Sequence, residues 1–79
     1  MKIAVKILPR REVLDTQGRA VEQALNSQNH SITSCRVGKY VEVVLNEADR
    51  EMALNKVREM AEQLLHNPLT ETFQLEVVD

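Results

Sequence analysis

The segment NEADREMALNKVREMAEQLLHNP, residues 46–68, carries the strongest helical pattern in the chain. We expect Asn46 to cap the start of this helix, with Asp49 complementing the N–H groups of the first turn. The helix should end near His66 and Asn67, because Pro68 follows. Its apolar residues recur at three- and four-residue intervals, as on the buried side of an amphipathic helix: Met52, Ala53, Val57, Met60, Ala61, Leu64 and Leu65.

The segments that flank this helix alternate apolar and polar residues, which predicts strands over residues 40–45 and 73–77. Val41, Val43 and Leu45 form the inner row of the first, with Tyr40, Glu42 and Val44 on the opposite face. Residues 32–37 are rich in β-branched side chains and predict one more strand. Gly38 and Lys39 would then form a two-residue hairpin turn with a positive φ at the glycine. In that strand Cys35 should face inward as an inert buried thiol.

The N-terminal part repeats the order of strand and helix. Residues 2–8 alternate as a strand, which Pro9 ends because proline cannot donate to a ladder. Asp15 or Thr16 can cap the helix that follows, and polar residues 26–31 end it. Gly18 in the first turn is about 1 kcal/mol less favourable than Ala, which indicates a packing or functional reason for it. The expected inner side of this helix consists of Gln17, Ala20, Val21, Ala24 and Leu25.

The order of elements predicts one α+β domain over residues 1–79 with a ferredoxin-like βαββαβ fold. Such a domain has a four-stranded antiparallel sheet with two helices on one face. The other face and the edge strands stay uncovered in a monomer, which favours a homodimer, or a tetramer when other partners are absent. Tyr40 and Val44 are our candidates for that contact. The open face is partly apolar through Ala4, Leu8, Tyr40, Val44 and Val78.

Composition excludes several classes of function. The net charge is −2 and the only aromatic residues are Tyr40 and Phe73, which argues against a nucleic-acid surface. No apolar run approaches the roughly 20 residues of a membrane span. A single cysteine excludes an internal disulfide, so we expect a cytoplasmic protein. The chain has no glycine-rich phosphate loop, no metal-like spacing of His and Cys, and no pattern typical of a nucleophile with its base. We therefore expect this chain to contribute no catalytic, cofactor-binding or metal-ligating residue.

Three segments remain that the fold does not require: VLDTQGRAV at 13–21, RVGKY at 36–40 and LHNPL at 65–69. In these the sequence resembles the PurS family, the small subunits of bacterial phosphoribosylformylglycinamidine (FGAM) synthase. That family has a V-L-D-P-Q-G-x-A-V helix start, an R-x-G-K turn and an L-x-N-P stop, and all three are matched in order over essentially the whole chain. Thr16 replaces the usual proline, and residues 9–12 replace a loop of the Lys-Pro-Gly type.

The resemblance implies a non-catalytic subunit of a ligase in de novo purine (IMP) biosynthesis. The complex uses ATP, Mg and glutamine to convert formylglycinamide ribonucleotide (FGAR) to FGAM. The small subunit, as a dimer, joins the glutaminase PurQ to the synthetase PurL and aids the transfer of ammonia between them. A dimeric ligand-sensing regulatory module of ferredoxin-like fold is the competing class, which metabolite binding by the purified protein would reveal.

Contacts with the other subunits or with a second copy would fall on the matched segments and on the open face. For Asp15 and Gly18 the alternative is a purely local role in the helix start. For Arg36 and Lys39 the alternative is ordinary solvated turn charge. The full set of expected contact residues is Asp15, Gly18, Arg36, Gly38, Lys39, Tyr40 and Val44.

Overall fold

The sheet is built around the first predicted strand. A computed structural model describes residues 1–78. Strand β1 (Lys2–Pro9) pairs antiparallel with β2 (Lys39–Val44) on one side and with β3 (Glu71–Val77) on the other, in the order β2-β1-β3. Val5 lies opposite Val41 on one neighbour and opposite Leu75 on the other. Paired residues of neighbouring strands point their side chains to the same face of the sheet. The apolar residues of the three strands therefore gather on one face, as the alternation predicts.

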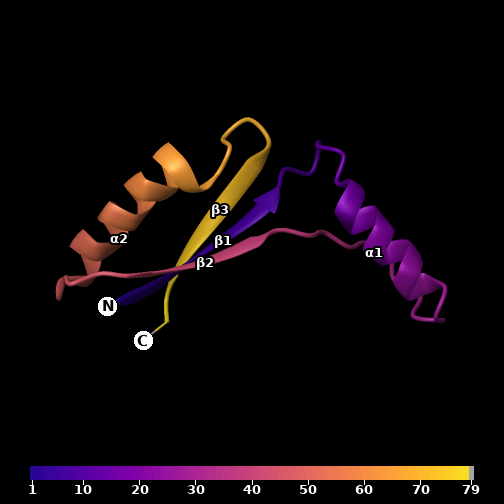
Figure 1. Cartoon of the computed structure of the whole chain (residues 1–79), viewed down its shortest axis with the longest axis horizontal. Coiled ribbons are helices and arrows are strands. Elements are labelled where there is room, and N and C mark those ends of the chain that lie inside the picture. Colours follow the sequence, from indigo (N-terminus) through magenta and orange to yellow (C-terminus); the bar gives the residue numbers. More distant parts are fainter. Residues whose placement is uncertain (79) are drawn as a thin grey trace.

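Helix α2 (Arg50–Met60) covers that apolar face and continues into a π-helical turn, η1 (Ala61–Leu65) (Figure 1). Its buried positions are small or β-branched, so the helix can approach the sheet closely. Val41, Val43 and Leu45 pack against the resulting core from β2, which confirms the predicted inner row. The fully buried core consists of Ile3, Val5 and Ile7 of β1 with Ala53, Val57 and Ala61 of the helix.

The start of α2 differs from the sequence prediction. Asp49 is the cap, because its Oδ1 accepts a hydrogen bond of 3.1 Å from the N–H of Met52 while its own backbone is extended. Asn46 lies three residues before this cap, so its predicted capping role is wrong. The predicted end is confirmed, since the helical segment stops at Leu65, directly before His66.

Residues 32–37 do not form a strand, and no hairpin turn exists at Gly38 and Lys39; both predictions are wrong. The backbone of this segment bonds instead to side chains at the two ends of helix α1 (Thr16–Asn26). The Asn26 side chain donates to the Ile32 carbonyl (3.0 Å) and accepts from the Ile32 N–H (2.5 Å). Asp15 Oδ2 accepts from the Val37 N–H (2.9 Å). Because the backbone groups of Ile32 and Val37 bond to the two ends of α1, the segment runs back along that helix and leads directly into β2.

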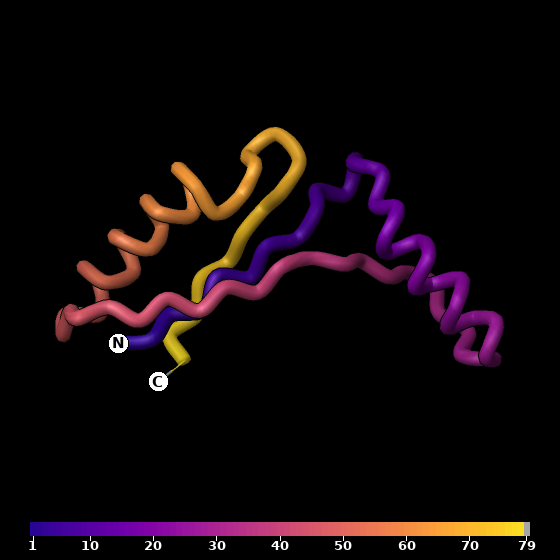
Figure 2. Tube along the Cα trace, viewed as in Figure 1, coloured from indigo at the N-terminus to yellow at the C-terminus, as the bar shows by residue number. Residues whose placement is uncertain are grey.

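Helix α1 lies beyond the end of the sheet rather than over the face that α2 covers (Figures 1 and 2). Its expected inner residues Ala20, Val21 and Ala24 are exposed, and Gly18 is the buried residue of this helix. The chain is therefore elongated, with extents of 47 × 27 × 14 Å and a radius of gyration of 15.5 Å. A compact domain of this length has a radius of gyration of about 12 Å.

The predicted fold class is confirmed as α+β and ferredoxin-like, with antiparallel strands and two helices. The described residues contain three strands where four were predicted. The predicted strand that does not form is residues 32–37, whose backbone bonds to Asp15 and Asn26 at the two ends of α1.

Candidate functional site

The three matched segments of the sequence meet at one end of the sheet. Asp15 of the first segment bonds to Val37 of the second, as described above. The loop after β1 is tied to the third segment, because the Arg10 guanidinium donates to the Pro68 carbonyl through Nε (3.0 Å) and Nη2 (2.8 Å). The Arg10 N–H also donates to the Thr70 carbonyl (2.8 Å). This end of the molecule is thus assembled from loops that are far apart in the sequence.

Asp15 holds this end together. Its Oδ1 accepts from the Gly18 N–H at 2.8 Å, which caps α1 as predicted, and its Oδ2 accepts from the Val37 N–H. These two hydrogen bonds, with a smaller contribution from the Arg36 charge, hold the pKa of the Asp15 carboxyl below its usual range. Asp15 therefore combines the local capping role with a long-range tie.

The two glycines are explained by close approach to backbone. A β-carbon at Gly18 would overlap the Asp15 carboxylate and lie 2.5 Å from the Cys35 carbonyl oxygen. A β-carbon at Gly38 would overlap the Ile7 carbonyl oxygen and lie 2.9 Å from Cδ2 of Leu8. The predicted positive φ at Gly38 is wrong, because no glycine among the described residues has one. The need for glycine is real but comes from packing.

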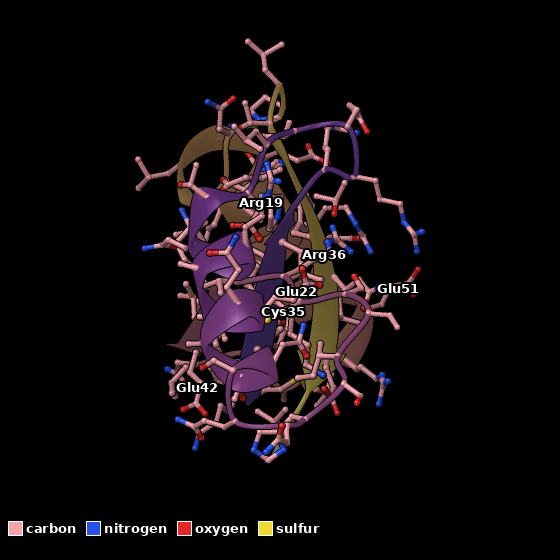
Figure 3. All side chains as sticks on the ribbon, turned by 90° about the vertical axis from the view of Figure 1, so that its right-hand side faces the viewer. Arg19, Glu22, Cys35, Arg36, Glu42 and Glu51 are labelled. Atoms are coloured by element: carbon pink, nitrogen blue, oxygen red, sulfur yellow. The ribbon has the colours of Figure 1, made fainter. Side chains whose placement is uncertain are left out.

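A hollow of about 510 Å³ lies between the loop after β1, the start of α1 and the segment before β2. Four of the six arginines of the chain line it, and Asp15 is the acid in its wall. The Arg36 Nη2 donates to the Pro9 carbonyl, so the guanidinium is fixed at the rim. Figure 3 looks onto this end of the molecule, with α1 in the foreground and Arg19, Arg36 and Cys35 labelled. The arginines are Arg10, Arg11, Arg19 and Arg36.

Cys35 also lines this hollow and is half-buried, so its predicted place in the inward row of a strand is wrong. Within residues 1–78, no group of three or more His, Cys, Asp and Glu side chains is placed to hold a metal ion. In the same described range, no helix is long and apolar enough to cross a membrane.

The remaining predicted site residues lie away from the hollow. Tyr40 and Val44 sit on the open face of β2 and are 56% and 72% exposed. The Tyr40 hydroxyl donates to the Glu42 carboxylate at 3.2 Å. Lys39 begins β2 and forms an ion pair of 3.4 Å with Glu71 of β3. The structure therefore brings Asp15, Gly18 and Arg36 together and leaves the other four in separate places.

Sequence reasoning did not join Arg36 to the other three arginines. Arg10 and Arg11 directly follow β1, and Arg19 lies in the first turn of α1, so two of the three are visible as a basic pair. Their approach to Arg36 depends on the Asp15–Val37 bond, which no local pattern encodes. The sequence signal for this hollow was a pair of basic residues between the end of a strand and the start of a helix.

The comparisons with known proteins agree with these features. The family model described as "PurS: Phosphoribosylformylglycinamidine (FGAM) synthase" matches residues 2–79. The phosphoribosylformylglycinamidine synthase subunit PurS of Bacillus subtilis is 38% identical over 77 residues, which cover 96% of this chain and 90% of that protein.

Solved structures give the same result. A crystal structure of B. subtilis PurS matches with a TM-score of 0.81 at 37% identity and covers 99% of this chain and 98% of that one. A chain in a structure of PurLQS from Thermotoga maritima matches with a TM-score of 0.87 at 26% identity and covers 95% of this chain and 93% of that one. On the sequence match over residues 2–79 and on this shared fold, the chain belongs to the PurS family of FGAM synthase subunits.

Proposed function

We propose that this chain is the small, non-catalytic subunit of an FGAM synthase in de novo purine biosynthesis. The observation that carries the proposal is the match of essentially the whole chain to PurS, both in sequence and in fold. A chain of the same fold occurs in a structure of PurLQS. We infer the corresponding partners here, the synthetase PurL and the glutaminase PurQ.

In this proposal the subunit joins PurQ to PurL and aids ammonia transfer between them. The ligase complex uses ATP, Mg and glutamine in the cytoplasm, and the chemistry takes place on the other subunits. The elongated shape supports a joining role, because a body 47 Å long with a thickness of 14 Å presents much of its surface to neighbours.

We also propose that the chain forms a homodimer, with a tetramer as the further state without PurL and PurQ. The support is its exposed apolar surface: Val44 and Tyr40 on the open face, and Val21 on the side of α1 that was expected to pack inward. A second copy of the chain would cover these residues and supply the packing that a single chain of this shape lacks.

The contacts with PurL and PurQ are proposed at the end of the molecule where the matched segments meet. Arg36 at the rim of the hollow and Lys39 at the start of β2 are both exposed, so a partner can reach their charged heads. Asp15, Gly18 and Gly38 support this surface indirectly, because they hold the backbone that presents it.

Reconstitution tests the subunit role. Purified PurL and PurQ are assayed for FGAM formation with glutamine or with ammonium chloride, with and without this chain. We expect the chain to be needed for the glutamine-dependent rate, because ammonia must then pass between two proteins. The ammonium-dependent rate should need it much less. An equal glutamine-dependent rate without the chain would contradict the proposal.

The exposed charges are tested by measuring the association of the chain with PurL. The double variant Arg36→Ala, Lys39→Ala should weaken association with PurL while its far-UV circular dichroism and melting temperature stay near wild type. The pair Arg50→Ala, Arg58→Ala on α2 removes the same charge at another place and serves as the control. Unchanged association of the first pair would leave these residues as solvated surface charge.

A further inference from the structure

The hollow between the loop after β1 and the start of α1 concentrates positive charge in a chain whose net charge is −2. Four guanidinium groups and one carboxylate line it, and both oxygens of that carboxylate already accept backbone hydrogen bonds. Asp15 offsets one of the four positive charges, so the wall keeps an excess of positive charge. The balance of charge in the wall favours an anionic occupant.

Two of the arginines are held in place by backbone rather than by acids. Arg10 donates two of its five N–H groups to the Pro68 carbonyl, and Arg36 donates one to the Pro9 carbonyl. Contacts with carbonyl oxygens orient a guanidinium without neutralising its charge. Pre-oriented guanidinium groups bind phosphate oxygens well, because the planar fork matches their geometry and little side-chain entropy is left to lose.

The other two arginines that line the hollow, Arg11 and Arg19, are exposed. Arg11 lies in the loop after β1 and Arg19 lies in the first turn of α1, so the four arginines come from three different segments. Val13 and Leu14 add an apolar part to the wall, and Leu14 is 65% exposed. A hollow of about 510 Å³ has room for a small molecule.

We propose that this hollow binds a small phosphorylated metabolite, with its phosphomonoester or diphosphate group among Arg10, Arg11, Arg19 and Arg36 and its organic part against Val13 and Leu14. The concave shape and the apolar wall favour a small molecule as the occupant. An acidic protein segment would instead bind to a flat basic surface. The proposal concerns the isolated chain and does not depend on assembly with PurL or PurQ.

Calorimetric titration of the purified chain in 150 mM NaCl tests the proposal, with inorganic pyrophosphate and ribose 5-phosphate as probes and ribose and citrate as comparisons. We expect saturable binding of pyrophosphate with a Kd of about 1 mM or tighter, and no binding of ribose. If neither pyrophosphate nor ribose 5-phosphate saturates the chain at about 10 mM, the proposal is overturned. Citrate bound as tightly as pyrophosphate would also overturn it, because the site would then read carboxylates.

A pair of double variants locates the site. Arg11→Gln with Arg19→Gln should weaken pyrophosphate binding by about tenfold or more, since it removes two charge-assisted contacts. These two side chains are exposed, so circular dichroism should show an unchanged fold. Arg50→Gln with Arg58→Gln lowers the net charge equally on α2, away from the hollow, and should change the Kd less than about twofold. Equal losses in both pairs would show that binding follows net charge alone and would overturn the proposal.

Discussion

At Gly38 the presence of a single β-carbon decides whether β2 can begin beside β1. Because that carbon would overlap the Ile7 carbonyl oxygen, Gly38→Ala should push the two strands apart at their first pair. We expect a loss of about 1–3 kcal/mol in the free energy of unfolding, measured by urea denaturation. Thr33→Ala, at an exposed position of the same segment, is the control and should stay within about 0.5 kcal/mol of wild type. A Gly38→Ala protein as stable as wild type would contradict the close approach.

Asp15 makes stability depend on pH in a defined window. Its pKa is lowered in the folded state by the Gly18 and Val37 N–H groups, so its carboxylate stabilises the fold above the pKa of the unfolded chain. That contribution is lost as the pH falls through the lower, folded-state pKa. The stability gap between wild type and Asp15→Asn should therefore stay constant from pH 7 to about pH 5 and shrink below about pH 4.

Thermal melts at a series of pH values measure that gap. Glu12→Gln in the same loop removes an equal charge at an exposed position and serves as the matched control. A gap for Asp15→Asn that stays the same down to pH 2 would mean that its two hydrogen bonds are not made by the ionised carboxylate.

At the scale of elements, two residues were candidates for the cap of α2, Asp49 and Asn46, and substitution distinguishes them. Asp49→Ala removes the acceptor for the Met52 N–H and should cost about 1 kcal/mol in the free energy of unfolding. Asn46→Ala, three residues earlier, should cost much less because Asn46 lies outside the helix. Urea denaturation of both variants decides the matter, and a larger loss for Asn46→Ala would restore the cap that the sequence pattern favoured.

The elements were predictable where a side-chain period was tied to burial. Alternation placed β1 and the inner row of β2, and the helical stripe placed α2, because each of these faces one core. Residues 32–37 have the β-branched composition of a strand but no partner edge. The side chains of Asn26 and Asp15 accept hydrogen bonds from the backbone of this segment instead. These residues are six and 22 positions away from their partners, so the bonds leave no local pattern in the sequence. For the same reason Arg10 and Arg11 were visible as a pair, whereas their approach to Arg36 was not.

At the scale of the whole molecule, the elongated chain should not stay alone in solution. Sedimentation at micromolar concentration should show a dimer or larger species rather than the 9.0 kDa monomer. Val44→Asp places a charge on the proposed contact and should raise the dimer dissociation constant by about tenfold or more. Leu69→Asp, at a side chain that is 83% exposed in the loop before β3, is the matched control. A purely monomeric wild-type chain would contradict the proposed dimer.

The central place of β1 in the sheet also bears on how the chain is made. Residues 2–9 leave the ribosome before both of their neighbours in the sheet, and one of these neighbours, β3, follows only after β2 and α2. The middle strand therefore keeps one edge unpaired until β3 has been synthesised, although α1 and residues 32–37, which bond to its two ends, can form earlier. Closing a sheet across almost the full chain is a slow, non-local step. Nascent chains should consequently remain open to chaperones, or to a second copy from the same messenger, until β3 has emerged.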